Sequence, residues 1–223
     1  MSELGRNIDM YPLTFKSSIS DRLEVIAPLV KTGKVLDLGV VDSRRLRHET
    51  SERLETKANL LFRQICKINP GTLGVDIDDE GIEILREEGY DVRTDNVMTM
   101  NLGEQFDVII AGEIIEHLDN PGHFLRNMRQ HLTLNGTLLI STPNPFYIKQ
   151  FWKIWRYNQP QVHEEHTCWF DPLTLSYLCR LSGLEPYAIY WVKSRKHLLK
   201  NWPQLVRNYF SHSFIILAKP AHD

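Results

Sequence analysis

The side chains best suited to chemistry in this sequence form a short block of two carboxylates and an imidazole, Glu113, Glu116 and His117. Their i, i+3, i+4 spacing places them on one face of a helical turn. Such a set can bind a ligand and cap a helix, or it can supply a general base, with His117 accepting a proton. It can also hold a hard divalent cation through carboxylate oxygens and one ring nitrogen. The sequence leaves these three uses open.

Two more imidazoles occur further along the chain, His163 and His166, in the segment Val-His-Glu-Glu-His-Thr-Cys-Trp-Phe. We expect His166 to join Glu116 and His117 as a candidate catalytic residue. His123 and His131 fall within a predicted helix, where a position on the helix surface is the simpler interpretation.

Two apolar segments end in acidic residues and tight turns, Lys-Val-Leu-Asp-Leu-Gly at 34–39 and Leu-Gly-Val-Asp-Ile-Asp at 73–78. In an open α/β sheet, ligands bind beyond the carboxyl ends of the strands. Gly39 would let the backbone approach a ligand closely, and Asp76 could accept hydrogen bonds from both hydroxyls of a ribose. The segments therefore predict a nucleoside-containing ligand. The alternative is a pair of ordinary strands with polar ends.

The residues after Gly39 narrow the choice of nucleoside. A dinucleotide site needs Gly-x-Gly-x-x-Gly, so that pyrophosphate can lie on a helix N-terminus. Residues 40–44 contain no further glycine, and Asp42 would repel phosphate. This argues against NAD and FAD. S-adenosylmethionine carries a ribose and an adenine but no phosphate, and it fits better.

Hydrophobic periodicity predicts strands that alternate with helices, a pattern typical of α/β folds. The expected strands are Lys34–Leu38, a segment after Gly71, Tyr90–Arg93, Phe106–Ala111, Thr137–Ser141, Glu185–Val192 and Ser213–Ala218. The expected helices are Ser18–Leu29, residues 51–68, Asp79–Glu88, Pro121–Leu132 and Asp171–Ser182. At 223 residues the chain suits a single domain, 1–223, with an N-terminal helical arm at 1–30 and a lid or acceptor insertion at 143–170.

Composition limits the partners that we expect. The net charge is −2 and the pI is about 6.5, so there is no global basic field for nucleic acid. No apolar run approaches the roughly 18 residues of a membrane span, and no signal pattern occurs at the N-terminus. The three cysteines form no Cys-x-x-Cys pair, which suggests a reducing, cytoplasmic setting. The oligomeric state is left open.

The insertion after the fifth predicted strand combines aromatic and cationic side chains. Trp152 and Trp155 could stack on a sugar or a base, and Lys149, Lys153 and Arg156 could hold a phosphate or carboxylate. The alternative is that the aromatic residues simply pack a lid helix.

Two further segments complete a set of motifs, Phe106–Leu118 with the carboxylate–imidazole block, and Gly136–Asn144. In order and spacing, the set resembles the class I S-adenosylmethionine-dependent methyltransferases that carry a Glu-x-x-Glu-His block. The resemblance covers roughly residues 20–220. It implies a Rossmann-like, doubly wound, seven-stranded, mainly parallel sheet with helices on both faces, an antiparallel last strand beside strand five, and a small lid insertion. One departure is that the family's Gly-x-Gly-x-Gly loop is reduced here to Gly39-Val-Val-Asp-Ser.

The resemblance also implies roles for individual residues. Asp37 acts electrostatically and through water near the methionine moiety, Asp76 accepts from the ribose, and Asp95 accepts from the adenine amino group. The full set of expected cofactor-binding residues is Asp37, Gly39, Asp76, Ile77, Asp95, Asn96, Gly112 and Glu113.

A narrower resemblance concerns a metal. Residues 141–144 and His166 are similar to a pattern in small-RNA 3′-terminal 2′-O-methyltransferases, which implies Mg²⁺ or Mn²⁺ held by Glu113, Glu116, His117 and His166. Ubiquinone-pathway O-methyltransferases share the Glu-x-x-Glu-His block. We favour metal-free acid–base or structural use of these residues over a metal.

The resulting functional expectation is S-adenosylmethionine-dependent O-methylation of a small-molecule or sugar/glycan hydroxyl. The alternatives are a metal-dependent RNA 2′-O-methyltransferase, which the near-neutral charge disfavours, and a non-catalytic S-adenosylmethionine-binding protein.

Overall fold

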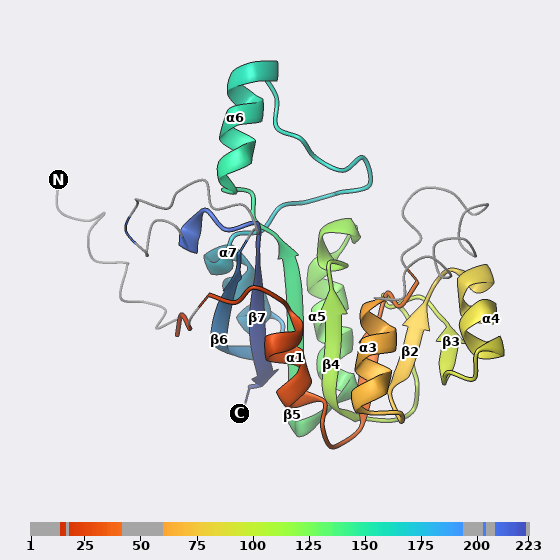
Figure 1. The fold of residues 1–223 in the computed structure, drawn as a ribbon. Helices are drawn as coiled ribbons and strands as arrows, with labels where there is room; N and C mark the ends of the chain where they lie inside the picture. Colours follow the sequence, from red (N-terminus) through yellow and green to blue (C-terminus); the bar gives the residue numbers. More distant parts are fainter. Residues whose placement is uncertain (1–13, 17, 42–59, 194–202, 204–207, 222–223) are drawn as a thin grey trace.

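A seven-stranded sheet with the strand order β3-β2-β1-β4-β5-β7-β6 organises the chain (Figure 1). The structure is a computed structural model that describes residues 14–16, 18–41, 60–193, 203 and 208–221. The strands are β1 (Val35–Leu38), β2 (Leu73–Asp76), β3 (Val92–Thr94), β4 (Phe106–Gly112), β5 (Leu132–Pro143), β6 (Leu184–Val192) and β7 (Ser213–Pro220). β1 to β5 pair in parallel, and β7 runs antiparallel between β5 and β6. The expected doubly wound, mainly parallel sheet is confirmed, including the antiparallel last strand beside strand five.

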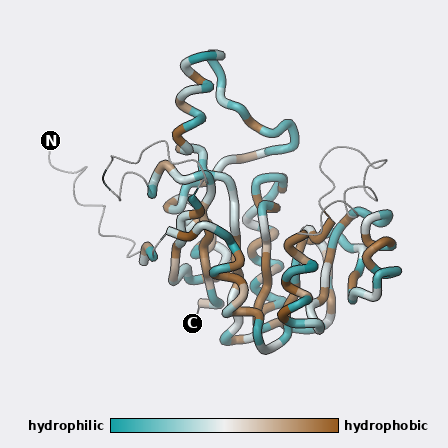
Figure 2. The backbone as a smooth tube through the Cα atoms, viewed as in Figure 1, coloured by the Kyte–Doolittle hydropathy of each residue, from teal (hydrophilic) through white to brown (hydrophobic). Residues whose placement is uncertain are grey.

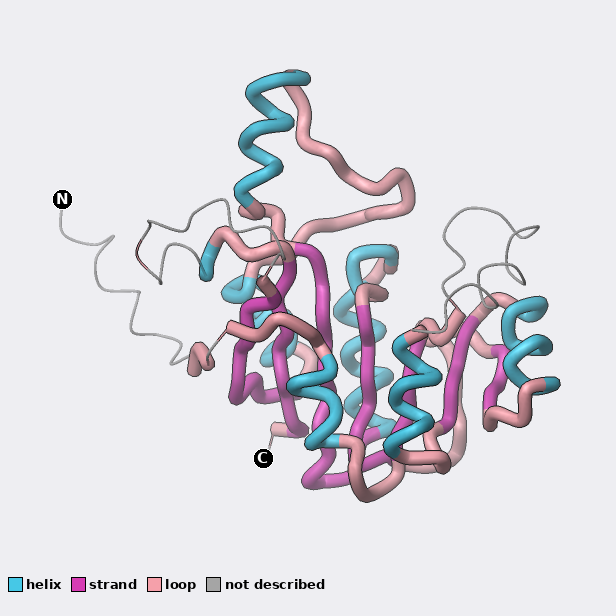
Figure 3. Tube along the Cα trace, viewed as in Figure 1, coloured by secondary structure: helices cyan, strands magenta, loops and turns pink. Residues whose placement is uncertain are grey.

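Helices cover both faces of this sheet, as expected (Figure 3). α1 (Leu23–Leu29), α3 (Leu61–Ile68) and α4 (Asp79–Glu87) lie on one face, and α5 (Pro121–His131) and α7 (Pro172–Leu181) lie on the other. The alternating side chains of the strands separate two cores. Val108 and Ile110 pack with Ile26 on the α1 side, whereas Ile109 packs with Phe124 on the α5 side. Figure 2 shows this apolar interior along the central strands.

The order of the strands reverses between β1 and β4, which are hydrogen-bonded neighbours. Leu38 at the end of β1 lies opposite Val75 of β2 and Ala111 of β4, so the three strands end at one edge of the sheet. Such a reversal point, at the carboxyl ends of the strands, is where open α/β sheets bind their ligands.

Several helix ends follow their local sequence signals. Asn120 caps α5 by accepting from the His123 N–H at 3.0 Å, and Asp171 begins α7 with a capping box completed by Thr174. Gly89 and Gly183 follow α4 and α7 with φ of +89° and +76°, a conformation that glycine adopts without strain. Local chemistry therefore accounts for these helix ends.

The N-terminal helix is shorter than expected. It was predicted to begin at Ser18, but α1 begins at Leu23, and the preceding residues pair with the outer edge of β6. Lys16 N–H donates to Ile189 O and Ile19 N–H donates to Trp191 O, both at 2.8 Å. The exposed backbone groups of an edge strand thus compete successfully with the first helical turn. The described helix Leu61–Ile68 confirms the end of the predicted helix 51–68, whereas residues 51–59 lie outside the described residues.

β5 is longer than expected, because it starts at Leu132 and not at Thr137. Its register against β4 shifts between Phe106 and Val108, which lets the Asn135-Gly136 pair remain within the strand as an irregularity. A Cβ at Gly136 would lie 2.9 Å from the Phe106 carbonyl oxygen, so this close approach requires glycine.

After β5 the chain forms α6 (Ile148–Tyr157) and then returns through residues 158–171, which we call the strap. Figure 1 shows α6 rising away from the sheet. α6 ends at Asn158 in the left-handed conformation, with φ of +57°. No helix among the described residues has the length and apolar character that crossing a membrane requires.

Candidate active site

The end of β1 brings a buried carboxyl beside a glycine turn. Asp37 is 3% exposed. Burial raises the pKa of its carboxyl to about 8, while the Arg22 guanidinium acts in the opposite direction. Gly39 follows with φ of +68°, and a Cβ there would meet Ile114 at 2.9 Å. Gly39 therefore has both a conformational and a steric reason to be glycine. Residues 42–59, with the last two residues of the shortened glycine loop, lie outside the described residues.

The end of β2 presents an anchored carboxylate and an exposed apolar side chain. Asp76 accepts from the Val41 N–H at 2.8 Å through one oxygen and from the Asp78 N–H at 3.0 Å through the other. Burial raises its pKa, and these hydrogen bonds oppose the rise. Each carboxylate oxygen keeps a second lone pair for a ligand. Ile77, the next residue, is 68% exposed although it is a large aliphatic side chain.

Asp95 and Asn96 lie next to this position, directly after β3. The Asp95 N–H donates to the Asp76 carbonyl at 2.9 Å, which holds the two segments together. The Asp95 carboxylate accepts from the Asn96 N–H at 2.7 Å. The structure thus brings Asp76, Ile77, Asp95 and Asn96 together at one edge of the sheet, as the sequence predicts.

The end of β4 contains a contact that the sequence did not suggest. Glu113 adopts φ of +54°, which is uncommon for a residue with a side chain. Its carboxylate lies 3.4 Å from Arg22, and Arg22 also donates to the Ser141 hydroxyl at 3.4 Å. Arg22 therefore links the start of α1 to the ends of β4 and β5, beside Gly112. A single arginine before a short helix carries no motif, and this explains why it was missed.

Glu116 points into the protein and not toward solvent. It is 1% exposed, and its carboxylate accepts from the Thr142 hydroxyl at 3.0 Å. Glu116 belongs to a short 3₁₀ turn, η3 (Ile115–His117), in which Glu116 is buried and His117 is only partly buried. Glu116 thus connects η3 to β5.

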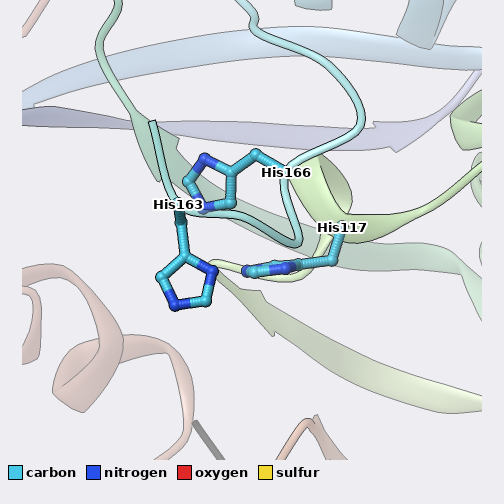
Figure 4. Close-up of side chains that lie close together, drawn as sticks. All are labelled: His117, His163 and His166. Carbon is cyan, nitrogen blue, oxygen red and sulfur yellow. The ribbon is translucent and has the colours of Figure 1, made fainter. Parts of the chain in front are cut away.

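His117 meets both strap histidines (Figure 4). Its ring centroid lies 4.7 Å from that of His166, with the rings nearly perpendicular, and 5.8 Å from that of His163. One ring nitrogen of each of the three lies within 4.8 Å of the others. We call these three residues the histidine cluster. His163 was not among the predicted site residues, because its approach depends on the path of the strap.

The strap is fixed against η3 by hydrogen bonds from Thr167 to main-chain carbonyls. Thr167 N–H donates to the Glu116 carbonyl at 2.8 Å, and the Thr167 hydroxyl donates to the Leu118 carbonyl at 2.6 Å. Because these bonds lie one residue from His166 and one from His117, they hold the cluster in place. Preorganisation of this kind is what a catalytic or metal-binding site requires.

The predicted metal ligands are only partly brought together. Among the described residues, the group with metal-binding spacing consists of His117, His163 and His166. Glu113 faces Arg22, and Glu116 faces Thr142, so neither carboxylate belongs to this group. The candidate ligands that the structure brings together are therefore three imidazoles. Imidazole ligands suit zinc, iron or nickel better than Mg²⁺.

A separate open groove of about 750 Å³ lies between the segment after β3 and α5, bordered by Met98, Gly103, Arg126 and His131. It contains none of the predicted site residues. The chemistry described above is concentrated at the strand ends and not in this groove.

Comparisons with known proteins bear on the family of the chain. A protein-family model described as a methyltransferase domain matches residues 15–189. A ubiquinone biosynthesis O-methyltransferase from Bradyrhizobium diazoefficiens is 28% identical over 93 residues, 39% of this chain and 37% of that protein. The chain thus matches little more than a third of the length of this curated relative.

Solved structures share the fold. An S-adenosylmethionine-dependent methyltransferase from Archaeoglobus fulgidus aligns with a TM-score of 0.61 at 20% identity, over 89% of this chain and 91% of the other. A Burkholderia thailandensis N1-methyltransferase, solved with 1,6-didemethyltoxoflavin and S-adenosylhomocysteine, aligns with a TM-score of 0.51 at 18% identity, over 88% and 74%. The family match covers most of the chain, and the fold is that of these enzymes. The chain therefore belongs to the methyltransferase domain family.

Proposed function

We propose that the enzyme transfers the methyl group of S-adenosylmethionine to a hydroxyl of a small-molecule or glycan acceptor. The observation that carries this proposal is the histidine cluster beside the end of β4, where three imidazoles face one another. A hydroxyl must lose a proton when it is methylated, and imidazole is the side chain best suited to accept one near neutral pH. The partial relative named as an O-methyltransferase also supports an oxygen acceptor.

The cofactor is proposed to lie along the strand ends. Asp76 would accept from the ribose hydroxyls, and Ile77 would pack against the adenine, which accounts for its large exposed area before binding. Asp95 would accept from the adenine amino group, with Asn96 beside the ring. The methionine end would then lie toward Asp37, Gly39, Gly112 and Glu113.

The reaction itself is an in-line displacement. A bond forms between the acceptor oxygen and the methyl carbon while the carbon–sulfur bond breaks, and S-adenosylhomocysteine leaves. The protein's main contribution is to align the two reactants and exclude water. His117 accepts the hydroxyl proton, and His166 and His163 hold its ring. Glu116 is a positioning residue, because its bond to Thr142 fixes the turn that carries His117.

A second possibility within this function is a metal at the same cluster, favoured by the spacing of the three histidines. His117, His163 and His166 would hold the ion through one ring nitrogen each, since these nitrogens lie within 4.8 Å of one another. A bound metal would lower the pKa of the acceptor hydroxyl. His117 would then be a ligand and not the base.

The proposal is tested with radiolabelled S-adenosylmethionine and a panel of acceptors, each paired with an analogue that lacks the hydroxyl. We expect label in hydroxyl acceptors alone. His117→Ala should lower kcat by about 10²–10⁴, whereas His123→Ala on the exposed surface of α5 should not. Transfer to the hydroxyl-free analogues would refute an oxygen acceptor. Full activity after exhaustive chelation, with no metal found by elemental analysis, would exclude the metal and leave His117 as the base.

A further inference from the structure

α6 presents an unusual surface for a helix in a folded protein. None of its ten residues is buried. Trp155 is 78% exposed, Trp152 is 60% exposed, and Phe151 and Ile154 are 48% and 45% exposed. Isolated exposed apolar residues are ordinary, but a contiguous apolar patch of this kind marks a surface that binds something.

The apolar and cationic side chains of α6 occupy separate faces. At 3.6 residues per turn, the apolar side chains span an arc of about 160°, and the cations span about 60° beside it. The apolar face consists of Ile148, Phe151, Trp152, Ile154 and Trp155. The cationic face consists of Lys149, Lys153 and Arg156. The helix contains no acidic residue, so its charge is +3.

Contact with the rest of the protein is concentrated at the base of the helix. Phe151 meets Phe210 at a centroid distance of 5.6 Å. Further along, Trp152 and Trp155 pack edge-to-face on each other at 5.8 Å. Figure 1 shows the remaining turns standing clear of the sheet. The two tryptophans are therefore directed to an external surface and not to the core.

We propose that α6 binds the surface of an anionic phospholipid bilayer. A helix that lies in the membrane interface has an apolar face with Trp or Phe and a polar face rich in Lys and Arg, and α6 has both. Trp152 and Trp155 would lie at the level of the headgroups, where amphipathic rings are favoured. Lys149, Lys153 and Arg156 would pair with lipid phosphates. Charge complementarity favours an anionic bilayer over a partner protein with a neutral apolar groove. Such a groove would leave the three cations without anionic partners.

This inference does not depend on the acceptor or on the histidine cluster. It gives the insertion a purpose other than closure over the active site. Because the strap begins where α6 ends, a helix on the membrane would place the strap histidines near the lipid surface.

Co-sedimentation of the full chain with vesicles tests the proposal. Vesicles of phosphatidylglycerol and phosphatidylcholine in equal parts are compared with pure phosphatidylcholine at low salt. We expect binding to the anionic vesicles and at least tenfold weaker binding to the neutral ones. Each cation near an anionic surface contributes about fivefold. Lys149→Gln with Lys153→Gln should therefore reduce binding about 25-fold, and Trp155→Ala should reduce it about tenfold.

Matched controls separate a specific surface from general stickiness. Leu134→Ala removes a side chain that is 79% exposed at the far end of β5, and Lys31→Gln with Lys67→Gln removes two exposed cations elsewhere. Neither control should change vesicle binding. Far-ultraviolet circular dichroism of each variant establishes that it is folded.

Three results would overturn the proposal. The first is absence of binding to anionic vesicles. The second is self-association of the protein that the tryptophan variant abolishes without affecting vesicle binding, which would make this face an interface between copies. The third is an increase in acceptor KM for Trp155→Ala in vesicle-free solution with vesicle binding unchanged, which would make Trp155 an acceptor contact.

Discussion

Replacing Asp37 by Asn should remove a pH dependence of stability that this one buried carboxyl creates. Burial raises its folded-state pKa from 3.8 to about 8, and the 3% exposure of the residue agrees with that cause. Below about pH 4 the carboxyl is protonated in both states. Between about pH 4 and pH 8 the folded protein keeps a proton that the unfolded chain releases, so stability falls as pH rises and then levels off.

The size of the effect follows from the pKa difference. One pKa unit corresponds to 1.36 kcal/mol, so from pH 5 to pH 8 this carboxyl should cost about 3–4 kcal/mol of unfolding free energy. Asp37→Asn keeps the shape of the side chain without the charge. The unfolding free energy of the variant should therefore rise by that amount relative to that of the wild type between pH 5 and pH 8.

Urea unfolding of the wild type and of Asp37→Asn at pH 5, 6.5 and 8 measures this difference directly. The other carboxyls contribute equally to the stability of both proteins, so their contributions cancel. Asp91→Asn, on the exposed surface before β3, is the matched control and should follow the wild type. A constant difference between Asp37→Asn and the wild type across this range would refute the reasoning. If the sulfonium lies near Asp37 as proposed, cofactor binding at pH 7 should also release a proton, measured by calorimetry in two buffers of different ionisation enthalpy.

Three further substitutions probe the strand ends. Asp76→Ala should weaken S-adenosylmethionine binding by about 1.5–3 kcal/mol. It should also destabilise the fold, because the buried Val41 N–H and the partly buried Asp78 N–H lose their acceptor; calorimetry and urea unfolding measure the two losses, and unchanged affinity would remove the ribose role. Ile77→Ala should weaken cofactor binding about fivefold with a stability change within about 0.5 kcal/mol, since the side chain is exposed before binding; equal affinity would place the adenine elsewhere. Arg22→Ala should extend the loss of stability caused by Asp37 to higher pH, because the Arg22 guanidinium lowers the folded-state pKa of that carboxyl. Urea unfolding from pH 6 to pH 9 would contradict this if the loss levelled off at the same pH as in the wild type.

The strand ends could be predicted from sequence because their signals are local. An apolar run ending in Asp or Gly defines both a strand and its polar end, and the parallel order of such strands places Asp37, Asp76 and Asp95 on one edge.

What could not be predicted depends on contacts between distant segments. Ile19 pairs with the edge of β6, and no local pattern distinguishes that pairing from a longer helix. Glu113 and Glu116 are adjacent to His117 in sequence, yet they turn to Arg22 and Thr142. His163 joins His117 because Thr167 fixes the strap to η3. The partners of the carboxylate–imidazole block are thus set by tertiary structure.

The position of the transferred methyl group tests the central proposal most directly. S-adenosylmethionine labelled with ¹³C in its methyl group is incubated with an acceptor that carries both a hydroxyl and an amine, and the product is assigned by NMR. The account predicts label on oxygen, one S-adenosylhomocysteine per methyl transferred, and a large loss of rate in His117→Ala with cofactor affinity unchanged. Label on nitrogen or carbon, or transfer by His117→Ala at the wild-type rate, would contradict it.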